Sequence, residues 1–174
     1  MNNDFAKVIT PGVIRIEREL PKPIEKVWAY LTESEKRARW LAKGEMELVP
    51  AGKVRLEFMH SDLSPTPDTP PAKYNNMQEG HGFTGVITKL EPPNLLAFTW
   101  QENSEVTFEL HETPDAVRLT ITHRKLADTT EIKISVCAGW HTHLGILIDV
   151  LSGKTPASFW QVHTMLEEQY AERL

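Results

Sequence analysis

Three histidines, His60, His123 and His143, are spaced in phase with the side chains that the sequence predicts to face inward. Histidine changes charge close to neutral pH, so such rings can act as hydrogen-bonding or acid–base groups in a pocket wall. Alternatively, each ring is a core or rim histidine paired with a backbone group, because buried polar groups are usually satisfied locally. The sequence leaves both interpretations open.

Metal binding is the other chemistry that histidines suggest, and His141 and His143 lie two residues apart in a predicted helix. Side chains at that spacing lie about 200° apart around the helix axis, so both rings cannot bind one ion. Helical metal ligands are instead typically four residues apart. The sequence also has no glycine-rich phosphate loop and no nucleophile elbow. We therefore assign no catalytic residue, no metal site and no cofactor.

A group of aromatic residues would line whatever cavity the fold encloses. A mostly apolar wall with a few polar groups is typical of a small-molecule site. Each aromatic residue alone is also explained as ordinary core, because aromatic side chains dominate protein interiors. The candidate pocket residues are Trp40, Phe58, His60, Phe83, Phe98, Trp100, Phe108, His123, Trp140, His143 and Leu144.

Arg18 also falls in phase with inward-facing residues, because it alternates with Ile16 and Leu20 in a predicted strand at 13–20. A charge on an inner face is costly unless it is paired. Arg18 is therefore interpreted either as a strand-end arginine that reaches water or as a rim residue that faces an acidic ligand.

A curved sheet would bring these residues together. Turn-forming residues separate the later strands, which predicts an antiparallel meander. Side-chain alternation predicts the strand at 13–20, a hairpin at 45–60, and strands at 82–90, 95–101, 104–111 and 116–124. We expect residues 1–12 to form a short arm before the first strand.

Helical spacing predicts two short helices after the first strand, with Thr32 and Glu35 forming a capping box for the second. Asp128 and Glu131 are expected to cap a long helix that ends at Ser152-Gly153. A last helix is expected to start at Thr155-Pro156. The expected fold is therefore α+β, with about six to seven antiparallel strands wrapped around the long C-terminal helix.

We expect residues 1–174 to form one domain with its core at about 13–153. Residues 61–80 are rich in proline and have no periodicity, so we expect a functional or mobile loop, and a lid at the pocket mouth is one such function. Residues 155–174 form a C-terminal extension that is expected to pack on the outside or to make a homodimer contact.

Composition narrows the function classes. The 174 residues carry a formal net charge of −5 with interspersed acids and bases, so we expect no nucleic-acid partner. The longest apolar stretch, at 144–151, is too short to span a bilayer, so no membrane interaction is expected. The absence of a signal-peptide pattern and the single cysteine, Cys137, favour a cytoplasmic location.

Residues 23–32, PIEKVWAYLT, followed by Arg39-Trp40-Leu41, resemble the opening of the START-like (SRPBCC, helix-grip) superfamily. Three later segments agree with it: residues 85–87, 96–100 and 139–144. The chain is most similar to the branch named after the activator of the heat-shock-protein-90 ATPase. The resemblance implies a helix-grip fold with a pocket between sheet and helix, and it carries no fixed catalytic motif.

Three functions remain open on these grounds, because fold does not fix function. The first is binding of a small apolar or amphipathic molecule. The second is a chaperone interaction like that of the ATPase activator. The third is a cyclase or hydrolase, as in the polyketide cyclases of the superfamily, that uses His60, His123 or His143 as acid–base groups.

Overall fold

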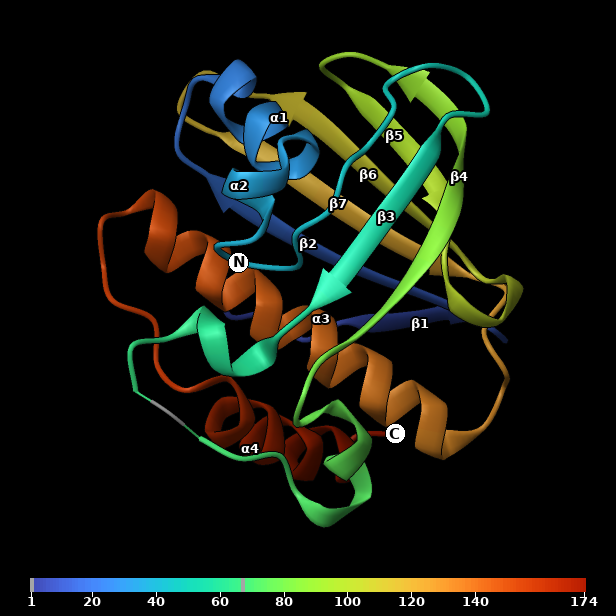
Figure 1. Cartoon of the computed structure of the whole chain (residues 1–174), viewed down its shortest axis with the longest axis vertical. Coiled ribbons are helices and arrows are strands. Elements are labelled where there is room, and N and C mark those ends of the chain that lie inside the picture. Colours follow the sequence, from blue (N-terminus) through green and yellow to red (C-terminus); the bar gives the residue numbers. More distant parts are fainter. Residues whose placement is uncertain (1, 67) are drawn as a thin grey trace.

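The computed structural model describes residues 2–66 and 68–174, so Met1 and Pro67, a proline of the 61–80 segment, lie outside the described residues. One curved antiparallel sheet has the strand order β1-β2-β7-β6-β5-β4-β3 (Figure 1). The strands are β1 (Lys7–Thr10), β2 (Val13–Leu20), β3 (Lys53–Phe58), β4 (His81–Glu91), β5 (Leu95–Thr99), β6 (Glu105–Glu112) and β7 (Val117–Arg124).

The helices follow the expected order. Short helices α1 and α2 come directly after β2, and the two long helices close the chain. Three short 3₁₀ turns lie in the loops that follow β3 and β5. The helical elements are α1 (Ile24–Thr32), α2 (Ser34–Arg37), η1 (His60–Leu63), η2 (Ala72–Met77), η3 (Gln101–Asn103), α3 (Thr130–Leu151) and α4 (Phe159–Ala171).

Strict alternation of side chains explains why the sheet has one buried face. In β2 every second residue is buried, including Ile16 and Leu20, while Glu17 and Glu19 point the other way. Strand β2 pairs with β7 so that Ile16 lies opposite Ile121, and both side chains are almost fully buried. A one-residue slip would turn all of these side chains over, so this register is well specified.

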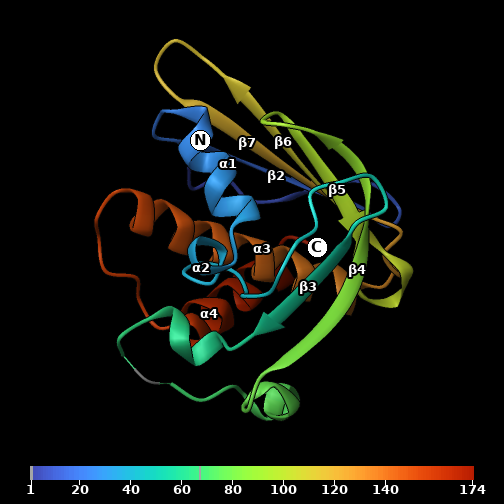
Figure 2. The same cartoon turned by 45° about the horizontal axis from the view of Figure 1, so that its top comes forward.

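Helix α3 lies across the buried face of the sheet, and α4 lies beside α3 (Figure 2). Leu144 and Leu147 of α3 have no exposed surface. By length and composition α3 is apolar enough to cross a membrane, but half of its apolar window is buried inside the fold. It packs as the core helix of an α+β helix-grip fold, and the predicted fold class is confirmed.

Several local expectations were wrong. Residues 7–10 of the expected arm form the edge strand β1, and only 53–58 of the expected hairpin is a strand, with Met46 making an isolated bridge to Val54. The Thr32 hydroxyl donates to the Trp28 carbonyl inside α1, so it does not cap α2. These errors come from local patterns that tertiary pairing overrides.

The two long helices also start a few residues away from the positions that the sequence predicts. Thr129, not Asp128, caps α3, because its hydroxyl accepts the Ile132 backbone N–H at 3.2 Å. The expected end was confirmed, since Gly153 has the left-handed φ of +72° that glycine tolerates best. Helix α4 begins at Phe159 and not at Pro156.

Candidate ligand pocket

A cavity of about 160 Å³ lies between the sheet, α3 and α4. Its wall is mainly aromatic, and half-buried or exposed side chains from η2, η3 and α3 lie at its rim. The lining residues are Leu41, Phe58, His60, Tyr74, Met77, His81, Trp100, Gln101, His123, Ser135, Val136, Gly139, Trp140, His143, Phe159, Trp160 and His163.

The structure divides the sequence candidates into wall and core. Those at the wall are Phe58, His60, Trp100, His123, Trp140 and His143. Those buried in the surrounding core are Trp40, Phe98, Phe108 and Leu144. Phe83 is half-buried outside the wall, and its ring centroid lies 4.9 Å from that of Trp100.

A stack of three near-parallel rings forms one side of the cavity. Phe58 ends β3, His60 starts η1 two residues later, and His81 starts the neighbouring strand β4. The Phe58 and His81 ring centroids are 4.9 Å apart with planes 7° from parallel, and His60 lies 5.6 Å from His81. Pairing of β3 with β4 sets Phe58 opposite His81, so the sheet register builds this stack.

His123 on β7 belongs to a hydrogen-bond chain that fixes its protonation. The indole Nε1–H of Trp140 donates to His123 Nδ1 at 3.1 Å. The neutral ring therefore carries its proton on Nε2, which lies 2.9 Å from Ser104 Oγ, and that hydroxyl donates to the Gln101 carbonyl at 2.8 Å. Both nitrogens are satisfied, and burial lowers the pKa of His123 to about 3.

His143 on α3 is fixed in the opposite tautomer. Its Nδ1 lies 2.7 Å from the Trp40 carbonyl, which can only accept, so Nδ1 carries the proton. In the neutral ring Nε2 is then an acceptor without a proton. Burial lowers the pKa of His143 to about 4, so the ring stays neutral at pH 7.

His60 is one of three wall histidines, with His81 and His163, whose buried Nδ1 has no hydrogen-bond partner among the described residues. The His60 side chain is 6% exposed. Its ring centroid lies 4.4 Å from that of Phe159 and 5.6 Å from that of His143. Burial, followed by the neighbouring histidines, lowers the pKa of His60 to about 2.

Sequence reasoning missed the part of the wall that comes from α4 and η2. Phe159, Trp160 and His163 of α4 line the cavity, although the C-terminal extension was expected outside the pocket. Their spacing of one and four residues places them on one helical face, which was the signal available in the sequence.

Tyr74 joins the second half of the 61–80 segment to both long helices. Its hydroxyl lies 2.8 Å from Ser135 Oγ on α3 and donates to Glu167 on α4 at 3.0 Å. Its ring stacks on Trp160 with centroids 5.2 Å apart. Figure 1 shows this segment running along α4. These contacts hold Tyr74 at the rim of the cavity.

The histidines around the cavity do not converge as metal ligands. No three His, Cys, Asp or Glu side chains within residues 2–66 and 68–174 are placed to hold one ion. Burial also lowers the pKa of His81 and His163. The wall is therefore a neutral, aromatic surface whose ring nitrogens supply hydrogen-bond donors and acceptors.

Solved structures resemble the whole chain. A Bordetella parapertussis protein determined by solution NMR is 40% identical, with 99% of this chain and 92% of that chain covered and a TM-score of 0.81. CalU16 from Micromonospora echinospora is 20% identical, with 97% and 93% covered and a TM-score of 0.64. DynU16, from the dynemicin biosynthetic locus, is 18% identical, with 87% and 51% covered and a TM-score of 0.67.

At these identities, CalU16 and DynU16 share the fold with this chain. No curated protein was found to match the sequence. Residues 21–152 match the family described as Activator of Hsp90 ATPase homolog 1-like protein. That match covers most of the chain and includes α3 together with every strand from β3 onward. The chain therefore belongs to the Activator of Hsp90 ATPase homolog 1-like family, within the START-like (SRPBCC) superfamily.

Proposed function

We propose that the cavity binds a small, neutral aromatic molecule that carries a hydroxyl group. The observation that carries this proposal is the fixed tautomer of His143, which leaves an unprotonated nitrogen on a residue of the mainly aromatic wall. The specificity of the site then follows from three properties of that wall: its size, its polarity and its lack of charge.

Size limits the ligand to about one ring. A cavity of about 150 Å³ in another protein binds benzene, and the cavity here measures about 160 Å³. Long-chain lipids and multi-ring molecules would extend beyond this volume. The rings of Phe58 and Trp140 supply apolar faces against which a planar ligand can pack.

Polarity selects a hydrogen-bond donor. His143 Nε2 can only accept, and a phenolic hydroxyl can donate to it while its ring packs on the aromatic wall. The unpartnered Nδ1 of His60 offers a second hydrogen-bonding position at the same wall. A buried polar atom without an internal partner is costly, and a ligand that pairs with it recovers that free energy.

Low histidine pKa values favour binding over acid–base catalysis. A general acid or base works best when its pKa is near the operating pH. The pKa of His60 is lowered to about 2 and that of His123 to about 3, so forming an imidazolium at pH 7 is strongly unfavourable. The wall also has no charge with which to hold an anion.

The test is a titration of the ¹⁵N-labelled protein with phenol, anisole and benzene, followed by NMR at the Gly139 amide, which lines the cavity. We expect phenol to bind about fivefold more tightly than anisole, because only phenol donates a hydrogen bond. His143→Phe should abolish this preference, and His111→Phe, at an exposed histidine, should leave it unchanged. Equal affinities for phenol and anisole in the unmodified protein, or no shift at Gly139, would refute the proposal.

A further inference from the structure

A second cavity, of about 290 Å³, lies on the opposite side of the α3–α4 pair. Helix α3 separates the two: Gly139 and His143 face the first cavity, whereas His141 and Gly145 face the second. The spacing that rules out a shared metal between His141 and His143 therefore assigns each ring to its own cavity. The residues lining the second are Asn2, Asn3, Arg18, His141, Thr142, Gly145, Ile146, Ile148, Asp149, Ala157, Val162, Met165 and Leu166.

Arg18 is the cation of this cavity. Its side chain is 1% exposed. Its Nη1 donates to the Glu17 carbonyl at 2.6 Å, while Nε and Nη2 are buried and have no hydrogen-bond partner among the described residues. Both interpretations offered by the sequence required a charge near the surface, yet the guanidinium is inside. A buried charge with unpaired donors is expensive, and this cost calls for a compensating ligand.

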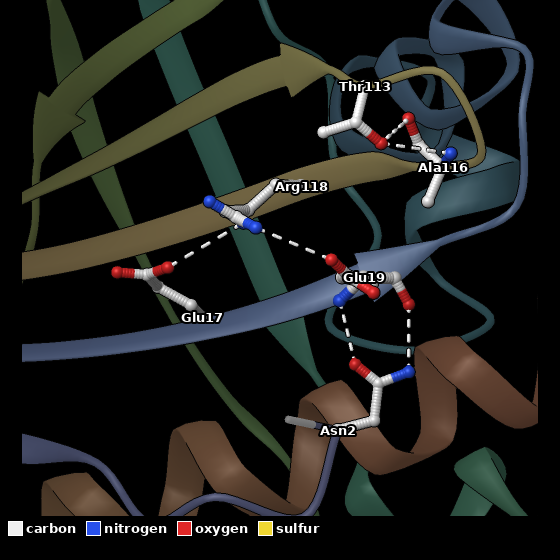
Figure 3. Close-up of polar contacts among 6 residues, drawn as sticks. All are labelled: Asn2, Glu17, Glu19, Thr113, Ala116 and Arg118. Carbon is white, nitrogen blue, oxygen red and sulfur yellow. Dashed lines mark hydrogen bonds and ion pairs between the residues drawn. The ribbon is translucent and has the colours of Figure 1, made fainter.

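The acidic residues nearest in sequence do not fill that role. Glu17 and Glu19 point to the other face of β2, where Arg118 lies 3.9 Å and 3.4 Å from their carboxylates (Figure 3). The negative charge of Asp4 opposes the lowering of the Arg18 pKa that burial causes, but Asp4 makes no hydrogen bond to Nε or Nη2. Nε and Nη2 of Arg18 therefore have no hydrogen-bond partner among the described residues, although Arg18 is one of the residues that line the cavity. Both atoms have almost no accessible surface, so a ligand would pair with them once the guanidinium turns toward the cavity.

The N-terminal arm completes the wall beside Arg18. The Asn2 side chain donates to the Glu19 carbonyl at 2.9 Å and accepts the Glu19 backbone N–H at 2.7 Å (Figure 3). This pair of bonds fixes the arm against β2. Since Asn2 and Asn3 both line the cavity, the arm contributes a polar edge to the part that contains Arg18.

The free edge of Arg18 has the geometry of a carboxylate receptor. Nε and Nη2 lie on one side of the planar guanidinium and can make two parallel hydrogen bonds to one carboxylate. The opposite walls, from Ile146, Val162 and Leu166, are apolar, and Met165 is 48% exposed at the same cavity. By comparison with a benzene-binding cavity of about 150 Å³, this volume holds a ligand of about a dozen non-hydrogen atoms.

We propose that the second cavity binds a monocarboxylate with a short apolar chain. Its carboxylate pairs with Nε and Nη2 of Arg18, and its chain lies between α3 and α4 against Ile146 and Leu166. The carboxylate of Asp149 lies eight residues beyond His141, about 12 Å along the helix, and disfavours a second anionic group at that end. The site is independent of the aromatic cavity.

The test uses octanoate as the probe and the Gly145 amide as the reporter in NMR titrations of the full chain. We expect octanoate to shift Gly145 but not Gly139, and 1-octanol and acetate to bind at least tenfold more weakly. Arg18→Met should weaken octanoate binding at least tenfold. Arg15→Met removes the same charge from the other face of β2 and should leave the affinity unchanged.

Arg18→Lys serves as a second variant, since it keeps the charge but loses the pair of parallel hydrogen-bond donors. It should bind octanoate more weakly than the unmodified protein does. Three outcomes would overturn the proposal. These are no binding of octanoate to the unmodified protein, equal binding to Arg18→Met, or a shift confined to Gly139.

Discussion

The two cavities share α3 and α4, but His123 and His143 at the first and Arg18 at the second differ in how their polar atoms are satisfied. In the aromatic cavity, His123 and His143 are neutral and each has a hydrogen-bond partner within the protein. In the second cavity, Arg18 is charged and two of its donor atoms have no partner among the described residues. A hydrogen-bonded neutral ring is stable in a folded protein by itself, whereas an unpaired buried charge is not.

This difference separates structural roles from binding roles. The Trp140–His123–Ser104 chain fixes the positions of three elements, so removing any member should destabilise the fold. Arg18 fixes little beyond one bond to a neighbouring carbonyl, so removing it should stabilise the fold and impair binding. The predictions below test this contrast, from the largest expected effect to the smallest.

Lowering the pH should destabilise the protein strongly, because the aromatic cavity is lined by buried neutral histidines. Unfolded histidines bind protons below about pH 6.5, but the folded pKa values of His60, His123 and His143 are about 2, 3 and 4. Between these limits the unfolded chain binds more protons, so stability falls as the pH falls. The free energy of unfolding should drop by up to about 5 kcal/mol from pH 6.5 to pH 5. Urea unfolding at several pH values measures it, and a flat profile would contradict the account.

Trp140→Phe should destabilise the fold by about 2 kcal/mol, because it leaves the buried Nδ1 of His123 without its donor. Urea unfolding at pH 7.5 measures the change. Trp28→Phe is the matched control. Trp28 is only half-buried in α1, so this variant should lose less stability. If both variants lose the same stability, the hydrogen-bond chain is not what holds this cavity together.

Arg18→Met should instead stabilise the fold. We expect its free energy of unfolding without ligand to rise by about 1 kcal/mol. The physical reason is that a flexible apolar side chain of similar length replaces an unpaired buried guanidinium. Arg15→Met provides the comparison on the outer face, where little change is expected. A loss of stability in Arg18→Met would show that the charge is paired in solution.

Tyr74→Phe should cost about 0.5–1 kcal/mol, since it removes the bonds that the Tyr74 hydroxyl makes with Ser135 and Glu167. The ring itself would still stack on Trp160. Amide hydrogen exchange over residues 72–77 should become faster, while exchange in β6 and β7 stays unchanged. Unaltered exchange in η2 would mean that the hydroxyl does not hold this segment at the rim.

Much of the fold was predictable because its signals are periodic. The alternation in β2 and the helical stripe through α3 identify which side chains face inward, and the segments at 23–32 and 139–144 resemble a known superfamily. The short strand β1 was missed because its four residues carry too little pattern. Its pairing with β2 is a tertiary contact that a local sequence window does not contain.

The candidate sites were only partly predictable. Strand and helix phase placed Phe58, His123 and Trp140 near one another, but they could not show that α4 adds Phe159 and His163 to the same wall. The way in which helices pack depends on loop geometry, which leaves no periodic pattern in the sequence. The inward phase of Arg18 was visible in the sequence, whereas its lack of partners required coordinates.

A single NMR experiment tests the central claim, which is that α3 separates two independent sites. Phenol and octanoate are added to the ¹⁵N-labelled protein, each alone and then each in the presence of a saturating amount of the other. The account predicts that phenol moves Gly139 only, that octanoate moves Gly145 only, and that neither ligand changes the affinity of the other. Competition between the two ligands, or one ligand moving both glycines, would contradict it.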